Sequence, residues 1–306
     1  MTKGKAHYMQ AVLDDSPVEL FAPNHTVMVD YPYRLGNPGQ GCSSPTLAGK
    51  STYILDSRIT DPDIGNVDVL ERAEEIDCDY VVPADVMADR EKTSEAIREF
   101  FQLLPDYDIG GAEVIIPIQH DGDVGGMGDS YDKDHVKHYQ EVKNILEEFN
   151  RDIKDHKVAI GGVVKWDNPE QLQVSIMMRE HTGIHQDLHG LGVGFDWDWT
   201  CIIRTLPWLF DSIDNSRSGQ QIRNGKILSP ELEVMTYKNP RGKNSTFLNA
   251  LLQEHSLYMA VYLMTSYVRD TDAPTDVAGL PDDLREQVVA HMEWREEQPA
   301  EMEVIA

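Results

Sequence analysis

Short apolar runs alternate along the chain with longer stretches in which apolar residues recur every three to four positions. Such short runs, when bounded by polar residues or glycine, are typical of buried strands, and the periodic stretches are typical of amphipathic helices. The predicted strands lie at residues 18–22, 26–29, 52–57, 80–85, 113–119, 158–163, 187–194 and 201–210. The predicted helices lie at residues 90–104, 133–150, 169–180 and 247–269.

This alternation predicts βαβ units and a parallel sheet. With an eighth strand expected near 18–29, we predict an α/β fold of the (βα)8 TIM type with a reduced C-terminal helical subdomain. A doubly wound sheet is the alternative, although no Gly-x-Gly-x-x-Gly sequence opens a helix after the first strand. We expect one domain over 1–306, with an acidic tail at 271–306 that contains a helix at 282–294.

The charge of the chain is unusual for a nucleic-acid enzyme. The 53 acidic and 27 basic residues give a formal net charge of −26, whereas nucleic-acid binders usually carry a basic patch. The acidic residues occur along the whole chain, which favours a surface suited to high salt, as in a halophilic archaeon or its virus. Because salt itself weakens phosphate contacts, the sign of the charge does not decide the substrate.

The ends and the apolar runs indicate a cytoplasmic protein. No run approaches the ~20 apolar residues that a membrane span needs, and the first ten residues contain no apolar signal core. The three cysteines, Cys42, Cys78 and Cys201, are widely separated, so they predict neither a disulfide framework nor a cysteine-rich zinc site.

Polar side chains stand at the ends of several predicted strands. Asp56, Asp85 and Gln119 each end such a strand, and Asp211 follows the apolar run 201–210. In a barrel the carboxyl ends of the strands meet on one face, where barrel enzymes hold their reactive groups. The alternative is structural: Asp56 would cap a helix, Asp85 with Asp89 would cap the helix at 90–104, and Gln119 would only bridge neighbouring strand ends.

Several short sequences, in order along 52–220, resemble motifs of the tRNA-guanine transglycosylase family. They are Asp56-Ser57, Asp85 after two valines, Gln119, Ile160-Gly161-Gly162, Leu191-Gly192-Val193-Gly194 and Phe210-Asp211 followed by Arg217. The compact chain is most similar to the branch of that family that acts on DNA, the 7-deazaguanine transglycosylases of the DpdA type found in viruses and mobile elements. Each motif is short, and the ordered series carries the resemblance.

The resemblance implies a role for each matched residue. Asp211 would be the nucleophile that attacks the sugar, and Asp56 would handle the base during exchange. The remaining residues would bind the substrate: Ser57, Asp85, Gln119, Gly161, Gly162, Gly192 and Arg217. A carboxylate at position 85 suits the N–H edge of guanine, and glycines allow a flat base to approach the main chain.

The chain departs from the family in two places. Arg58-Ile59 stands where the family continues with two glycines, and the region 229–270, the remnant of the family's zinc subdomain, contains no cysteine. We therefore predict no zinc and no cofactor. His181, His185 and His189 are spaced like a metal-binding helical face, but Gly183 interrupts them, which favours solvent or loop histidines.

The expected function is therefore a transferase reaction, guanine exchange in DNA for a 7-deazaguanine such as the 7-cyano form, through a covalent aspartyl intermediate. The alternatives are the same exchange on tRNA, in the queuosine or archaeosine pathway, and a catalytically silent barrel that binds a purine or a partner subunit. The expected partners are DNA and the free 7-deazaguanine base, and a homodimer or partner subunit is left open. Trp197, Trp199 and Trp208 are candidates for stacking on exposed bases.

Overall fold

The computed structural model describes eleven segments of the chain: residues 7–11, 33–36, 52–57, 64–76, 78–122, 131–164, 166–193, 197–215, 226–228, 234–236 and 277–298. Of the first 50 residues these segments include only two strands. The predicted strands at 18–22 and 26–29, the helix at 247–269 and Arg217 lie outside them.

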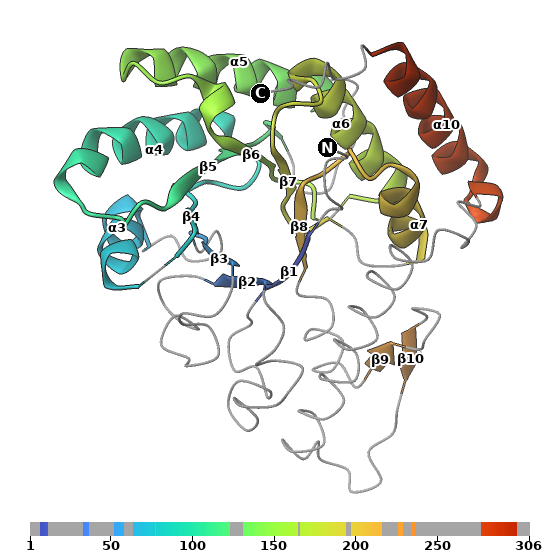
Figure 1. Ribbon diagram of the computed structural model, residues 1–306, viewed down its shortest axis with the longest axis horizontal. Coiled ribbons are helices and arrows are strands. Elements are labelled where there is room, and N and C mark those ends of the chain that lie inside the picture. The colour runs from blue at the N-terminus through green and yellow to red at the C-terminus, as the bar shows by residue number, and fades with distance from the viewer. Residues whose placement is uncertain are drawn as a thin grey trace, which may run out of the picture.

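Eight parallel strands form one curled sheet (Figure 1). They are β1 (His7–Ala11), β2 (Tyr33–Gly36), β3 (Thr52–Leu55), β4 (Tyr80–Val81), β5 (Glu113–Ile118), β6 (Lys157–Ile160), β7 (Leu188–Gly190) and β8 (Ser212–Asn215). Each strand pairs with the next one along the chain, and β1 also pairs with β8.

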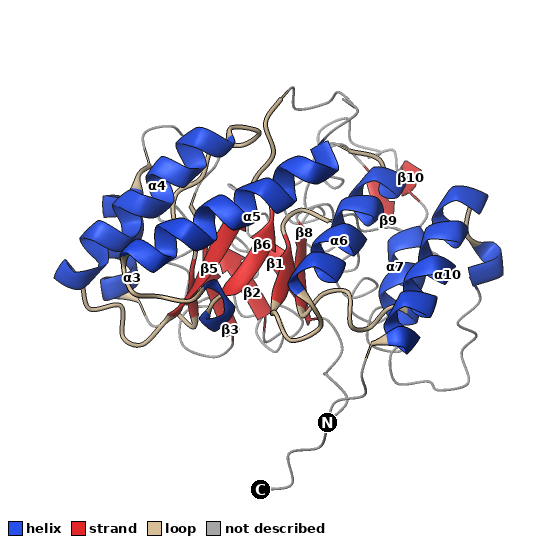
Figure 2. Ribbon diagram, turned by 90° about the horizontal axis from the view of Figure 1, so that it is seen from above, coloured by secondary structure: helices blue, strands red, loops and turns tan. Residues whose placement is uncertain are grey.

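Helices alternate with these strands and cover the outer face of the sheet (Figure 2). They are α3 (Asn66–Glu75), α4 (Arg90–Leu103), α5 (Tyr131–Glu148), α6 (Asn168–Thr182) and α7 (Trp197–Thr205), which follow β3 to β7 in turn. The predicted α/β fold, with a curled parallel sheet and alternating helices, is therefore confirmed. Short 3-10 helices occur at Leu104–Asp106, Ile153–Asp155 and Val277–Gly279.

A pair of strands and a helix are described beyond β8. The antiparallel strands β9 (Lys226–Leu228) and β10 (Val234–Thr236) form a separate pair. Helix α10 (Asp282–Glu297) confirms the predicted helix at 282–294 and lies against α6, where His291 Nδ1 is 3.2 Å from a carboxylate oxygen of Glu180. This part of the acidic C-terminal region is therefore a packed helix.

Local capping signals explain where two of the helices begin. The Asp89 carboxylate accepts a hydrogen bond from the Lys92 N–H at the start of α4, and Asp167 accepts one from Glu170 N–H in a capping box at the start of α6. Helix α6 stops at Gly183, whose φ of 79° favours glycine. Asp89 is therefore the residue that caps α4, and the predicted alternative in which Asp85 shares this capping role does not hold.

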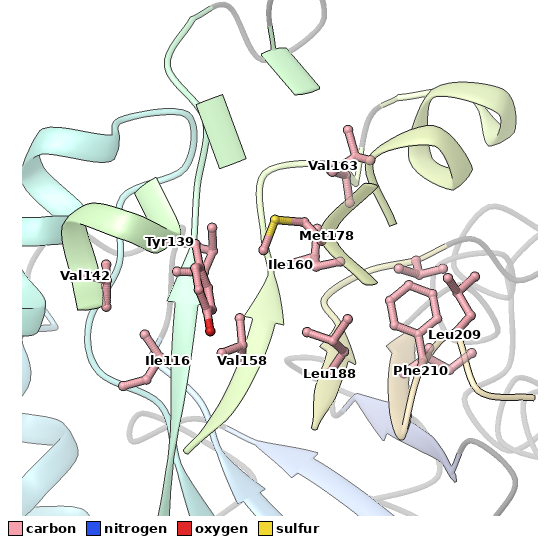
Figure 3. Packing of buried hydrophobic residues seen from close by; sticks show 14 of the residues in the cluster. Ile116, Tyr139, Val142, Val158, Ile160, Val163, Met178, Leu188, Leu209 and Phe210 are labelled. Atoms are coloured by element: carbon pink, nitrogen blue, oxygen red, sulfur yellow. The ribbon is translucent and has the colours of Figure 1, made fainter. Parts of the chain in front are cut away.

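The main core lies between the sheet and its helices (Figure 3). Strand β6 illustrates how it forms: Val158 and Ile160 point outward into this core, whereas Ala159 belongs to a smaller cluster on the inner face of the sheet, with Ile54, Val82 and Ile115. Because side chains alternate along a strand, every second position faces the inside of the curled sheet. Gln119 directly follows β5 and lies four positions after Ile115, so by this alternation its side chain faces the inside of the sheet as that of Ile115 does.

The apolar run at 201–210 is not a strand as predicted. Its first half belongs to α7, and β8 begins only at Ser212. The buried residues Trp199, Ile202, Ile203 and Leu206 explain the difference, because their spacing of three and four positions places them on one face of a helix. The predicted strand at 187–194 is likewise shorter, since β7 ends at Gly190. Among the described residues no helix is long and apolar enough to cross a membrane.

Candidate active site

Three carboxyl groups gather toward one end of the sheet. Asp56 follows β3, Asp85 lies four residues after β4, and Asp214 is the third residue of β8. Burial raises the pKa of Asp56 well above its ordinary value, and the nearby charges of Asp85 and Asp214 raise it further. Like charges this close do not all ionise together at neutral pH, so Asp56 is the carboxyl group best suited to keep its proton.

Asp85 is held by two side chains from neighbouring strand ends. Its Oδ1 accepts a hydrogen bond of 3.1 Å from the Ser57 hydroxyl, and its Oδ2 accepts one of 2.5 Å from Gln119 Nε2. Burial raises the pKa of Asp85 to about 6, although these two hydrogen bonds act in the opposite direction. The structure thus brings together three of the residues that the sequence predicts for the site.

A buried histidine positions Gln119. His138 on α5 accepts a hydrogen bond of 2.8 Å from the backbone N–H of Gln119 at Nδ1, and its Nε2 lies 3.0 Å from the Ser94 hydroxyl. Burial lowers the pKa of His138 to about 3, so the ring is neutral, as an accepting Nδ1 requires. Because Gln119 Oε1 also accepts from Ala88 N–H at 3.4 Å, the amide is oriented with its Nε2 toward Asp85.

Gly161 and Gly162 are needed where they stand because Gln119 lies against them. A Cβ on Gly161 would lie 2.5 Å from Gln119 Nε2. Gly162 has a φ of +79°, and a Cβ there would lie 2.7 Å from both Gln119 Oε1 and His120 Cδ2. These glycines therefore leave room for the side chains of His120 and of Gln119, which holds Asp85.

Asp214 and His189 form a second polar group on the inner face of the sheet. Asp214 Oδ1 accepts a hydrogen bond of 2.9 Å from Gly192 N–H and lies 3.4 Å from His189 Nε2. The other ring nitrogen of His189 lies 2.7 Å from the Ser212 hydroxyl. Both His189 and Asp214 are buried. The backbone of Gly192, predicted to bind substrate, is thus used to hold Asp214.

Asp211 lies elsewhere, contrary to its predicted place at the end of a strand. It directly precedes β8, where its N–H donates to the carbonyl of Leu188 at the start of β7. Its Oδ2 accepts a hydrogen bond of 2.8 Å from Leu188 N–H and lies 3.3 Å from a guanidinium nitrogen of Arg179 on α6. The carboxylate therefore sits at the amino end of the sheet and points outward to a helix.

The tryptophans and histidines that the sequence singles out lie in different surroundings. Trp199 is buried and packs near Phe210, whereas the half-buried Trp208 lies near His291 and Arg295 of α10. His181 and His185 are exposed whereas His189 is buried. Among the described residues no group of three potential ligands could hold a metal ion.

No protein-family model matches the chain, and no curated protein matches it significantly. The sequence analysis did not identify Asp214 or His189 as site residues. The one sequence signal for Asp214 was its position as a second aspartate, three residues after Asp211 in the same segment.

Proposed function

We propose that this protein is a guanine transglycosylase, built on a (βα)8 TIM-type barrel, that replaces guanine in DNA with a 7-deazaguanine. The sequential pairing of eight parallel strands, with β1 against β8, supports the barrel assignment. The observation that carries the reaction is the cluster of Asp56, Asp85 and Asp214 at one end of that sheet, in which the pKa values of Asp56 and Asp85 are raised.

Base exchange with retention needs two carboxyl groups in different protonation states. One attacks the anomeric carbon as an ionised nucleophile while the bond from that carbon to guanine N9 breaks. The other donates its proton to the leaving base, then takes a proton from N9 of the incoming 7-deazaguanine as the new bond forms. Asp56 suits the proton-transfer role, because burial and its two acidic neighbours favour its neutral form.

The Asp85 carboxylate suits recognition of the base. Guanine presents two N–H donors side by side, and a carboxylate is their natural acceptor. Ser57 and Gln119 each occupy one acceptor position of Asp85, and a carboxylate has about four. Each oxygen of Asp85 can therefore accept a further hydrogen bond from a base. The hydrogen bonds from Ser57 and Gln119 also fix the orientation of the carboxylate.

Labelled-guanine exchange tests the proposal directly. The protein in molar KCl would be incubated with radiolabelled guanine and with duplex DNA, single-stranded DNA or tRNA. Incorporation into DNA supports the proposal, and incorporation into tRNA alone would move the substrate to the tRNA branch of the reaction. Incorporation into none of the three would contradict the enzyme and favour a silent purine-binding barrel.

Replacing Asp85 with alanine should weaken binding of free guanine by roughly 1.5–3 kcal/mol, the cost of losing hydrogen bonds to a charged group. This corresponds to a Kd that rises about 10- to 150-fold, measured by calorimetry. Asp89→Asn provides the matched control, since Asp89 lies in the same loop but caps α4. If Asp85→Ala binds guanine as the wild type does, Asp85 has no part in base recognition.

We further propose that the reaction needs no zinc, because 229–270 contains no cysteine to bind it. Exchange activity and melting temperature should both be unchanged after dialysis against EDTA. Stoichiometric zinc in the purified protein, with unfolding on chelation, would contradict this and direct attention to histidine ligands.

A further inference from the structure

We infer that Asp214, rather than Asp211, is the nucleophile of the proposed exchange. This inference rests on the proposed function and assigns one catalytic residue within it. The resemblance to known motifs pointed to Asp211, and the strand register of β8 changes the assignment.

The register places the two aspartates on opposite sides of the sheet. Ile213 belongs to the outer core, so its neighbours Ser212 and Asp214 face inward. The contacts of Asp214 with His189 and Gly192 N–H agree with this direction. Asp211 has the same parity as Ile213, and its ion pair with Arg179 of α6 lies on the outer side.

The hydrogen bonding of Asp214 suits a nucleophile. Gly192 N–H donates a hydrogen bond of 2.9 Å to its Oδ1 and fixes the position of that oxygen. Its Oδ2 has no hydrogen-bond partner among the described residues, so one oxygen is held while the other stays available for attack. The neighbouring Asp56, whose pKa its charge raises, provides the protonated group that the departing base requires.

His189 is the positioning residue for this carboxylate. When its Nδ1 accepts the Ser212 hydroxyl at 2.7 Å, its Nε2 carries the hydrogen and faces Asp214 Oδ1 at 3.4 Å. His189 Nε2 makes no hydrogen bond among the described residues, so Asp214 Oδ1 is the polar atom that it approaches. The ring therefore lies beside the oxygen that Gly192 N–H holds and leaves the other oxygen free.

Asp211, in contrast, already serves the fold. Its Oδ2 accepts from the Leu188 backbone and from Arg179. Arg179 is fully buried, and it also donates to the carbonyls of Leu209, Gly183 and Gln186. A group that balances a buried guanidinium cannot swing to the opposite end of a strand to attack a sugar.

The chemical step balances on these residues. An Asp214 oxygen forms a bond to the anomeric carbon as the bond to guanine N9 breaks, and the Asp56 proton moves to the departing base. N9–H of the incoming 7-deazaguanine then returns a proton to Asp56 as N9 bonds to the anomeric carbon and the aspartyl ester breaks. No oxidant or reductant is required.

Covalent trapping tests the assignment. The wild type, Asp214→Asn and Asp211→Asn would be mixed with end-labelled DNA, denatured rapidly in acid and separated on a gel. We expect Asp214→Asn to lose the protein–DNA adduct by at least a thousandfold with an unchanged melting temperature. Asp211→Asn should retain the adduct within about tenfold while melting at a lower temperature. Loss of the adduct in folded Asp211→Asn, with trapping kept in Asp214→Asn, would overturn the inference.

Mapping the wild-type adduct needs no variant to fold. The tryptic peptide 205–217 contains both aspartates, so fragmentation spectra must place the modified residue within it. A sugar adduct on Asp214 supports the inference, and one on Asp211 or Asp56 overturns it while leaving the proposed function intact. Absence of both exchange and adduct in the wild type would instead overturn the proposed function, and the inference with it.

Discussion

Asp211→Ala is expected to lower the free energy of unfolding by about 3–5 kcal/mol, because it removes the carboxylate beside a guanidinium that is fully buried. Desolvation by burial already lowers the pKa of Arg179, and Asp211 is the first group that opposes this effect. The variant also leaves Leu188 N–H without its side-chain acceptor. For a chain of this size the melting temperature should fall by roughly 5–15 °C.

A second arginine–carboxylate pair provides the matched control. Arg98 on α4 makes two hydrogen bonds of 3.2 Å to Glu148 at the end of α5, but both side chains are substantially exposed. Exposed pairs contribute about 0–1 kcal/mol, so Glu148→Ala should shift the melting temperature by no more than a few degrees. Equal shifts for Asp211→Ala and Glu148→Ala would show that Asp211 is not needed to balance Arg179.

Asp56→Asn is expected to raise stability at neutral and alkaline pH, at the expense of activity. The pKa of Asp56 is raised in the folded protein, first by burial and then by Asp85 and Asp214. The folded state therefore binds this proton more tightly than the unfolded state, and stability falls as pH rises from about 4 through the raised pKa. An asparagine cannot ionise, so the variant should escape this loss.

Melting temperatures recorded between pH 4 and pH 8 at constant KCl check this expectation. The curves of the wild type and Asp56→Asn should nearly coincide at pH 4 and separate steadily toward pH 8, with the variant higher. Asp106→Asn removes one exposed negative charge and controls for the general repulsion of an acidic chain. A variant that is less stable than the wild type at pH 8 would mean that ionised Asp56 stabilises the fold.

Most of the α/β framework could be predicted from local sequence signals. The strands β3, β5 and β6 are short apolar runs with polar or glycine ends, and α4 and α6 begin at aspartate caps. The region before β8 could not be predicted in the same way. A buried helix followed by a buried turn is apolar at most positions, so hydrophobicity alone does not distinguish 201–210 from a strand.

Local sequence signals likewise predict some residues of the candidate site and not others. Asp56, Asp85 and Gln119 were predictable because each follows a strand whose end the sequence marks clearly. The choice between Asp211 and Asp214 depends on where β8 begins, and a shift of one residue exchanges the two faces of a strand. His138 and His189 were not predictable as site residues, because their roles depend on which side chains the fold places beside them.

Stoichiometry of base release is the most direct measure of the central claim. DNA labelled in its guanine bases would be incubated with the protein and 7-cyano-7-deazaguanine, and both the released bases and the digested nucleosides would be quantified by mass spectrometry. Base exchange predicts one free guanine for every 7-deazaguanine nucleoside formed, with the DNA backbone intact. Guanine released without incorporation would indicate a glycosylase that leaves abasic sites, and no release under any salt condition would contradict the proposed activity altogether.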